Sequence, residues 1–214
     1  MNDLLISVAV FLIAHIIPSH KDLRDFFVRL MGERVFMSVY GVISLGLFIW
    51  LLYAYLDAPY IELWMVADWM KLVVLFVMFW VCFFLVCTFS QPNPFSIGLG
   101  GKRFDPQKPG IVSLTKHPGF VAFALWSGVH MLPNGDVASV VFFGLMCVLS
   151  LYGPKSLNDK RIRKMGFEAW QDLDQQIVKG LPRIGWKRWL VTIILYVSLF
   201  YAHEPVIGVM PYSW

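Results

Sequence analysis

The stretch Val35–Leu56, with the sequence VFMSVYGVISLGLFIWLLYAYL, contains 22 residues and no charged side chain. As an α-helix it would extend about 33 Å, because each residue adds about 1.5 Å. The hydrocarbon core of a bilayer is about 30 Å thick, so the stretch predicts a transmembrane helix. Arg34 precedes it and Asp57 follows it, and basic residues mark the cytoplasmic end of a span.

The whole chain has the composition of a membrane protein. Of its 214 residues 58% are hydrophobic and 15% are charged, and the mean hydropathy is +0.64; soluble domains contain about 25% charged residues. We therefore predict an all-α fold, a polytopic membrane helix bundle of about six spans. The six apolar segments are Asp3–Ile17, Val35–Leu56, Trp69–Phe89, Gly119–Leu132, Val137–Tyr152 and Trp189–Ala202.

The basic residues alternate between the connecting segments. Seventeen of the eighteen Lys and Arg residues follow the first, third or fifth apolar segment. The segments after the second and fourth carry acidic residues instead: Asp57, Glu62, Asp68 and Asp136. This alternation predicts three cytoplasmic basic segments and both termini outside. The first segment has no basic residues before it, so we interpret it as an anchor and not as a cleaved signal.

The fourth apolar segment is short. From Pro118 to Leu132 a helix would extend only about 22 Å, less than the hydrocarbon core. The fourth and fifth segments are therefore predicted to form a short helical hairpin, turned by residues 133–136, that enters the membrane without fully crossing it. A tilted neighbour or a locally thinner bilayer is the commoner explanation.

We expect one integral-membrane domain over residues 1–214. Within it, residues 154–188 form a cytoplasmic basic segment with nine basic and four acidic side chains. The pattern over Leu157–Val178 predicts an amphipathic helix, whose apolar side chains face the bundle or the membrane surface.

Several function classes lack support. The net charge is +4, but no zinc-finger, helix-turn-helix or RNA-binding motif accompanies it, so nucleic acid is not an expected partner. The cysteines Cys82, Cys87 and Cys147 all lie in apolar segments without Cys-x-x-Cys spacing, which argues against disulfides, zinc and c-type haem. Motifs of nucleotide hydrolases, serine hydrolases and zinc proteases are missing from the sequence.

Two of the five histidines lie inside predicted spans. His15 is near the inner end of the first, and His130 is late in the fourth, each between apolar residues. Ionisable side chains in membrane helices usually face the bundle interior, so we expect an internal polar role for both, with interhelical hydrogen bonding as the competing use. His20 and His203 lie at span ends, where contact with water or headgroups is the simpler interpretation.

The residues before His130 favour a flat cofactor. Phe123 and Trp126 precede it by seven and four residues, on the same helix face. An apolar ring between aromatic walls, with neutral imidazole as axial ligand, is what haem b requires; ordinary packing is the more frequent use of such a stripe. His15 would supply the second iron ligand, although by depth in the membrane His117, at the start of the fourth span, matches His15 better.

Two arginines are candidates for the edge of the cofactor. Arg24 and Arg161 would pair with haem propionates, since fixed cations stabilise carboxylates. Anionic lipid headgroups are the alternative partners.

A series of short motifs runs along most of the chain in a specific order. They are His15 with Pro18 and Arg24, Gly32 with Arg34, Asn93-Pro94, Gly110–Pro118 (GIVSLTKHP), Leu125–His130 (LWSGVH) with Asn134-Gly135, and Asp159–Arg161 (DKR). In this order they resemble the NnrU family of bacterial inner-membrane proteins. The resemblance implies an association with nitrite and nitric oxide reduction, and it would make the two outer termini periplasmic.

The NnrU family is in turn similar to zeta-carotene isomerase of plants and cyanobacteria, which uses haem b to isomerise a cis double bond. This resemblance implies His15 and His130 as the haem ligands, in preference to His15 and His117, which lie at more similar depths in the membrane. In the isomerase, a cysteine three residues before the second histidine takes part in ligand exchange on reduction. Ser127 stands at that position here, which argues against the same redox switch.

A wider resemblance concerns isoprenylcysteine and phospholipid methyltransferases, which bind S-adenosylmethionine. Lys116–Pro118 and Met165–Trp170 look like two of their elements, but the stretch that corresponds to their Glu-Glu pair reads Asn158-Asp159-Lys160-Arg161 and contains no such pair. Loss of those carboxylates disfavours methyl transfer. His117 then has a structural interpretation, as the cap of a helix with Pro118 at its first position.

Two functions remain from the sequence. We prefer a haem b protein of the bacterial inner membrane, accessory to nitrite or nitric oxide reductase components. The alternative is a haem-dependent cis-trans isomerase of a polyene, an apolar small molecule. In either case the lipid bilayer is a partner.

Overall fold

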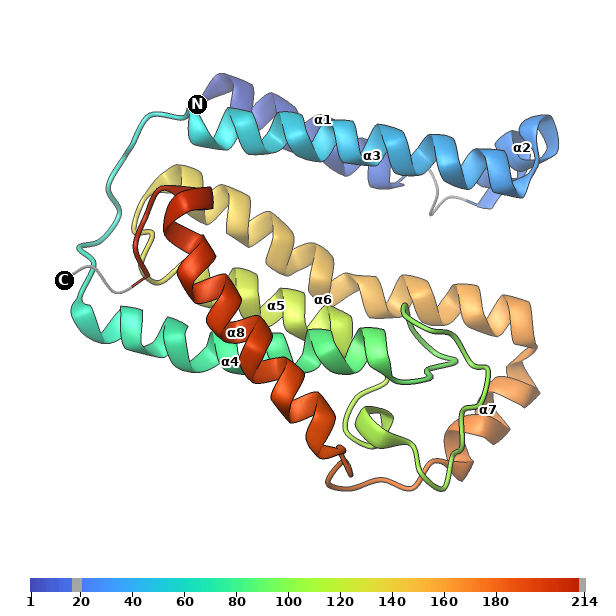
Figure 1. Cartoon of the computed structure of the whole chain (residues 1–214). Coiled ribbons are helices and arrows are strands. Elements are labelled where there is room, and N and C mark those ends of the chain that lie inside the picture. Colours follow the sequence, from blue (N-terminus) through green and yellow to red (C-terminus); the bar gives the residue numbers. More distant parts are fainter. Residues whose placement is uncertain (17–20, 212–214) are drawn as a thin grey trace. The chain divides into compact units, whose positions relative to one another are not determined.

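A computed structural model describes residues 1–16 and 21–211 (Figure 1). Its helices are α1 (Asn2–Ile16), α2 (Lys21–Met31), α3 (Glu33–Leu56), α4 (Asp68–Ser90), α5 (Pro118–His130), α6 (Val137–Met165), α7 (Phe167–Gln176) and α8 (Trp186–Ile207), with a 3-10 helix η2 (Gly110–Ser113). Over the described residues there is no strand, only an isolated bridge between Glu62 and Asp136. The all-α prediction is confirmed. Pro18 and His20 lie outside the described residues.

The chain divides into two compact units. Unit 1 comprises Met1–Met65 and Gly135–Leu145, and unit 2 comprises Val66–Asn134 and Met146–Trp214. Helix α6 begins in unit 1 and continues in unit 2. Each unit is described by itself below.

In unit 1, α1 and α2 both pack on α3. The ring of Phe11 from α1 lies 6.4 Å from that of Phe48, and Phe27 from α2 stacks on Phe36 at 6.3 Å. Aromatic pairs of this kind add to the burial of apolar surface. The amphipathic α2 is therefore attached to α3 through its apolar face.

The segment after α3 is tied to the start of α6. Both Leu63 and Trp64 donate their backbone N–H groups to the carbonyl oxygen of Gly135, at 2.7 and 3.2 Å. A Cβ atom at position 135 would lie 2.2 Å from the Trp64 carbonyl oxygen, so only glycine fits this approach. Asp136 then caps α6 by accepting the N–H of Ser139 at 3.0 Å.

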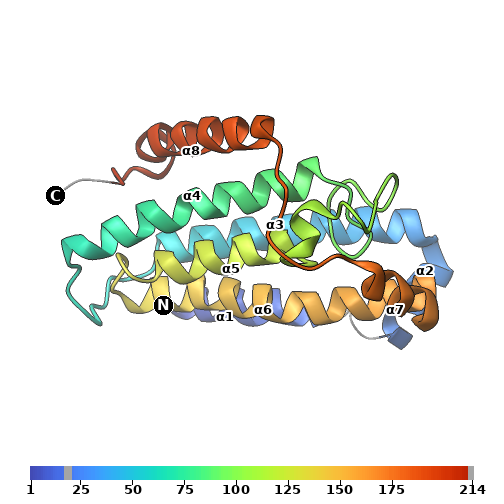
Figure 2. The same ribbon diagram turned by 90° about the horizontal axis from the view of Figure 1, so that it is seen from below.

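Unit 2 is built around α4, which packs on α5 and on α8 (Figures 1 and 2). The Phe83 ring of α4 stacks on Trp189 of α8 at 4.6 Å, and the Tyr196 hydroxyl donates to the Leu75 carbonyl oxygen at 3.1 Å. Between α5 and α6 the close neighbours are Phe120 and Gly153. Large aromatic contacts therefore hold α8 on α4, and a small residue allows α5 to approach α6.

Among the described residues, four helices are long and apolar enough to cross a membrane: α3, α4, α6 and α8. They have 24, 23, 29 and 22 residues. The other two predicted spans correspond to α1 with 15 residues and α5 with 13, both shorter than a full crossing requires. The chain is a membrane protein with four such helices, while the count of six and the hairpin of the fourth and fifth segments stay predictions.

The amphipathic helix predicted over Leu157–Val178 is wrong as a single element. Helix α6 continues to Met165, and α7 begins at Phe167 after Gly166, whose φ of +87° lies in the left-handed region. Glycine adopts that conformation without the steric cost that other residues meet. The break lets α7 change direction, and Ile177 directly after it is buried in the core of unit 2.

Candidate functional site

His15 lies on α1 in unit 1, half-buried beside two aromatic rings. Its Nδ1 is 2.8 Å from the backbone carbonyl oxygen of Phe11. The Phe11 ring lies 4.1 Å from the imidazole, and the Tyr40 ring of α3 lies 6.0 Å away, edge-on. The Phe11 ring therefore forms an aromatic wall beside the His15 imidazole.

His130 is the last residue of α5 in unit 2, and its surroundings repeat this arrangement. Its Nδ1 is 2.7 Å from the carbonyl oxygen of Trp126, and the two rings are 5.5 Å apart. Phe123 lies edge-on to Trp126 at 6.3 Å. The Asn134 amide donates to the His130 carbonyl oxygen at 2.7 Å and holds the end of the helix. The stripe expected from the spacing, Phe123 to His130, is one continuous row.

Both histidines share a defined tautomer. A carbonyl oxygen only accepts hydrogen bonds, so Nδ1 of His15 and of His130 carries the hydrogen. In the neutral ring the lone pair is then on Nε2. Histidines that bind metals almost always donate their other ring N–H to a carbonyl or carboxylate in this way. The two residues therefore fit the chemistry of haem ligation one by one, His15 within unit 1 and His130 within unit 2.

His117 precedes α5 in a different environment, a buried polar network. Only 7% of its surface is exposed. Its Nε2 donates to Oδ1 of Asn158 on α6 at 2.9 Å, and the Ser96 hydroxyl donates to Nδ1 at 3.2 Å. Burial lowers the pKa of His117, because the charged form is desolvated. Both ring nitrogens bond within the protein, which favours the structural interpretation over a role in ligation.

The two candidate arginines have different partners. Arg161 donates from Nη2 to the carbonyl oxygen of Ser96 at 2.7 Å, and its buried Nε has no hydrogen-bond partner among the described residues. Arg24 donates to Glu33 at 2.8 Å and lies 3.8 Å from Asp25. The charge of Arg24 is thus already compensated on the surface of unit 1, and Arg161 binds the loop that holds His117.

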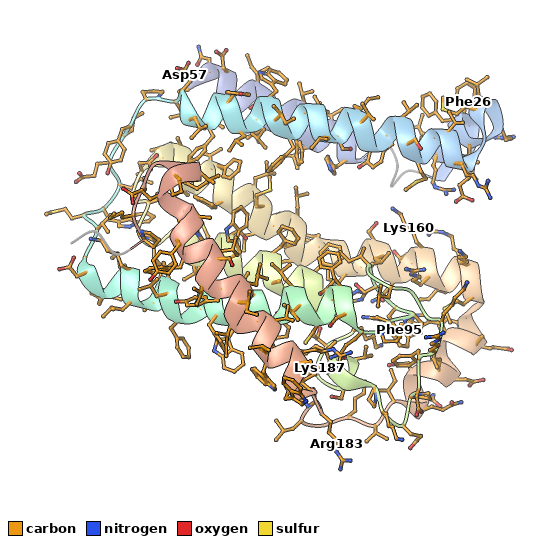
Figure 3. All side chains as sticks on the ribbon, in the orientation of Figure 1. Phe26, Asp57, Phe95, Lys160, Arg183 and Lys187 are labelled. Carbon is orange, nitrogen blue, oxygen red and sulfur yellow. The ribbon has the colours of Figure 1, made fainter. Side chains whose placement is uncertain are left out.

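Asn93 and Lys116 appear in the sequence motifs, but their place in this network was not predicted. The Asn93 amide donates to the Lys116 carbonyl oxygen at 2.9 Å, and the Lys116 ammonium pairs with Asp174 at 2.7 Å. The same ammonium lies 4.3 Å from the Trp170 ring and 5.5 Å from that of Phe95, a residue labelled in Figure 3. These contacts join the loop before α5 to α7. The Asn93-Pro94 motif and Lys116 beside His117 were the signals available.

Compared with known protein families, the chain matches the one described as NnrU protein over residues 3–211. This chain belongs to the NnrU family. No curated protein and no solved structure matches it.

Two motifs of this NnrU-family chain lie at the two ends of α5 in unit 2. Residues 110–118 form η2 and the approach to α5, where His117 is buried, and residues 125–130 form the last turns of α5 with His130. The first place has the network of charged and amide groups, and the second has an imidazole among aromatic rings. Of the candidate residues, the structure brings His117 and Arg161 together at Ser96, and Phe123, Trp126 and His130 together on α5.

Proposed function

We propose that this chain is an integral-membrane haem b protein that serves nitrite or nitric oxide reduction as an accessory or redox protein. The observation that carries the proposal is the shared geometry of His15 and His130. Each donates Nδ1–H to the carbonyl four residues earlier and stands beside an aromatic ring. Such a ring presents Nε2 in the form that binds iron.

The chain's own residues would have distinct tasks. His15 of unit 1 and His130 of unit 2 would each offer Nε2 to the iron, and Phe11 and Trp126 would offer flat apolar walls. Arg161 offers a fixed cation with a buried Nε for a carboxylate. Bound haem supplies one-electron transfer, and its potential depends on axial ligands and on burial.

Ser127 favours the accessory role over the isomerase. It is fully buried, and its hydroxyl donates to the Phe123 carbonyl oxygen at 2.7 Å. A hydroxyl is also a poorer ligand for soft metal centres than a thiolate. The exchange of ligands that a cysteine permits at this position is therefore not available to the serine.

The proposal includes a location and an orientation. The chain lies in the bacterial inner membrane with its basic segments in the cytoplasm and both termini in the periplasm. Two hydrogen bonds support this orientation, because they join the end of α4 and the basic segment after it to the basic segment over residues 154–188. Arg161 donates to the Ser96 carbonyl oxygen, and Arg188 donates to the Ser90 carbonyl oxygen. The four long helices and the shorter α1 and α5 together make the six spans of this proposal.

Absorption spectroscopy tests the haem. The chain is purified in mild detergent, and spectra are recorded in the oxidised and dithionite-reduced states. We expect sharp reduced bands that are lost in His15→Ala and in His130→Ala. His203→Ala is the matched control, because its Nδ1 also lies within 2.6 Å of a backbone carbonyl oxygen, that of Val209. Bands that persist in both single variants would refute ligation by this pair.

Two further assays separate the alternatives. Membranes that contain the protein are fed a cis-carotenoid, and we expect no change of isomer; conversion that depends on His130 would support the isomerase instead. Methyl transfer from S-adenosylmethionine is also expected to be absent, since Asn158, in place of a carboxylate, accepts a hydrogen bond from His117.

A further inference from the structure

An open apolar groove lies between the last turns of α4 and the first turns of α8, within unit 2. It has a volume of about 350 Å³ and is lined by Leu85, Val86, Phe89, Ser90, Val191 and Leu195. Phe89 is 62% exposed and Val191 is 49% exposed. Both helices are long and apolar enough to cross a membrane. A groove between them therefore faces the hydrocarbon chains of the lipids.

One end of the groove carries a fixed guanidinium. Arg188 donates from Nε to the Ser90 hydroxyl and from Nη2 to the Ser90 carbonyl oxygen, both at 2.9 Å. Because Ser90 itself lines the groove, these two bonds hold the arginine at its rim. A guanidinium has five N–H donors in a planar fork, and that fork matches the oxygens of a phosphate.

The positive charge at this end is not balanced by the neighbouring sequence. Lys187 in the first turn of α8 and Arg183, which precedes the helix, are both exposed and accompany Arg188 (Figure 3). No Asp or Glu lies between Asp174 and Glu204. Trp186, which is 69% exposed, begins the helix, and tryptophan is typical of the membrane–water interface.

We propose that this groove binds one acyl chain of an anionic phospholipid, whose phosphate is held by Arg188 and Lys187. The apolar lining binds the acyl chain, and the two cations favour a headgroup with a net negative charge. A free phosphate would use the cations but not the groove. The site is independent of haem, since it contains neither His15 nor His130.

Native mass spectrometry of the full chain tests the site. The detergent-purified protein is delipidated and then titrated with phosphatidylglycerol or phosphatidylcholine. We expect phosphatidylglycerol to be retained preferentially, and Arg188→Gln to lower its retention about fivefold, the effect of one basic residue near a membrane surface. Lys102→Gln is the matched control, because it also removes one positive charge, from an exposed residue outside the groove lining, and should leave retention unchanged.

A second pair of variants tests the apolar part. Val191→Trp fills the groove and is expected to abolish retention of the bound lipid, whereas Val197→Trp, on the same helix but outside the lining, leaves it unchanged. If Arg188→Gln does not fold by circular dichroism, the double variant Arg183→Gln, Lys187→Gln gives the headgroup test. Equal retention of the two lipids, or equal effects of the two tryptophans, would overturn the proposal and indicate ordinary annular lipid.

Discussion

At the scale of single residues, the surroundings of each imidazole decide its chemistry. His15 and His130 donate Nδ1–H to a carbonyl of their own helix, so their local backbone sets the tautomer. His117 instead bonds to Ser96 and Asn158, which come from other parts of the chain. The first two rings are oriented by their own helices, and the third joins a loop to a helix.

The His117 network predicts a dependence of stability on pH. Because burial lowers the pKa of His117 in the folded state, the unfolded chain takes up a proton first as the pH falls below about 6.5, the ordinary value for histidine. The contribution of neutral His117 to the free energy of unfolding is complete above that pH. It is lost as the pH falls toward the lower pKa of the folded state. Thermal unfolding between pH 7.5 and 5.5 should therefore show a falling midpoint.

The control for this measurement is His117→Gln, which cannot titrate. It should have a lower midpoint at pH 7.5 but a flatter dependence on pH than the unmodified protein. Equal slopes in the two proteins would show that other groups control the titration.

At the scale of elements, α5 and α6 approach each other at a glycine. A Cβ atom at Gly153 would lie 2.0 Å from the Phe120 ring, whereas one at Gly128 on α5 would meet nothing within 4 Å. Gly153→Ala should therefore destabilise the protein by about 1–3 kcal/mol, the usual cost of overpacking. Gly128→Ala should be neutral or stabilising by up to about 1 kcal/mol, since alanine is the better helix former.

Unfolding midpoints of these two variants in one detergent give the comparison. A Gly153→Ala protein as stable as Gly128→Ala would mean that the Phe120 side chain moves aside without cost.

The sequence predicted elements and single residues better than the contacts between distant residues. Long apolar runs identified the helices, and a histidine between apolar neighbours was enough to mark His15 and His130 as candidates. Ser96 and Asn158 were missed as partners of His117, because they lie 21 and 41 residues from it. Only the folded chain brings such short polar groups together. The break at Gly166 was missed because apolar residues continue at helical spacing on both sides of it.

At the scale of the whole molecule, the alternation of charge predicts the orientation of the termini. Alkaline phosphatase, which is active only outside the cytoplasm, should be active when fused after Trp214 and inactive when fused after Lys164, in the basic segment. Green fluorescent protein fusions should give the opposite pattern. Activity at both positions would contradict the proposed orientation.

The two bonds between Arg188 and Ser90 join residues that are 98 positions apart. At a synthesis rate of about 5–20 residues per second, the ribosome needs about 5–20 s to travel from one to the other. During that interval α4 has left the ribosome while the aromatic partner for Phe83 has not yet been made. The nascent chain therefore needs a temporary neighbour for this face, and truncation before α8 leaves it open to aggregation or to degradation by membrane proteases.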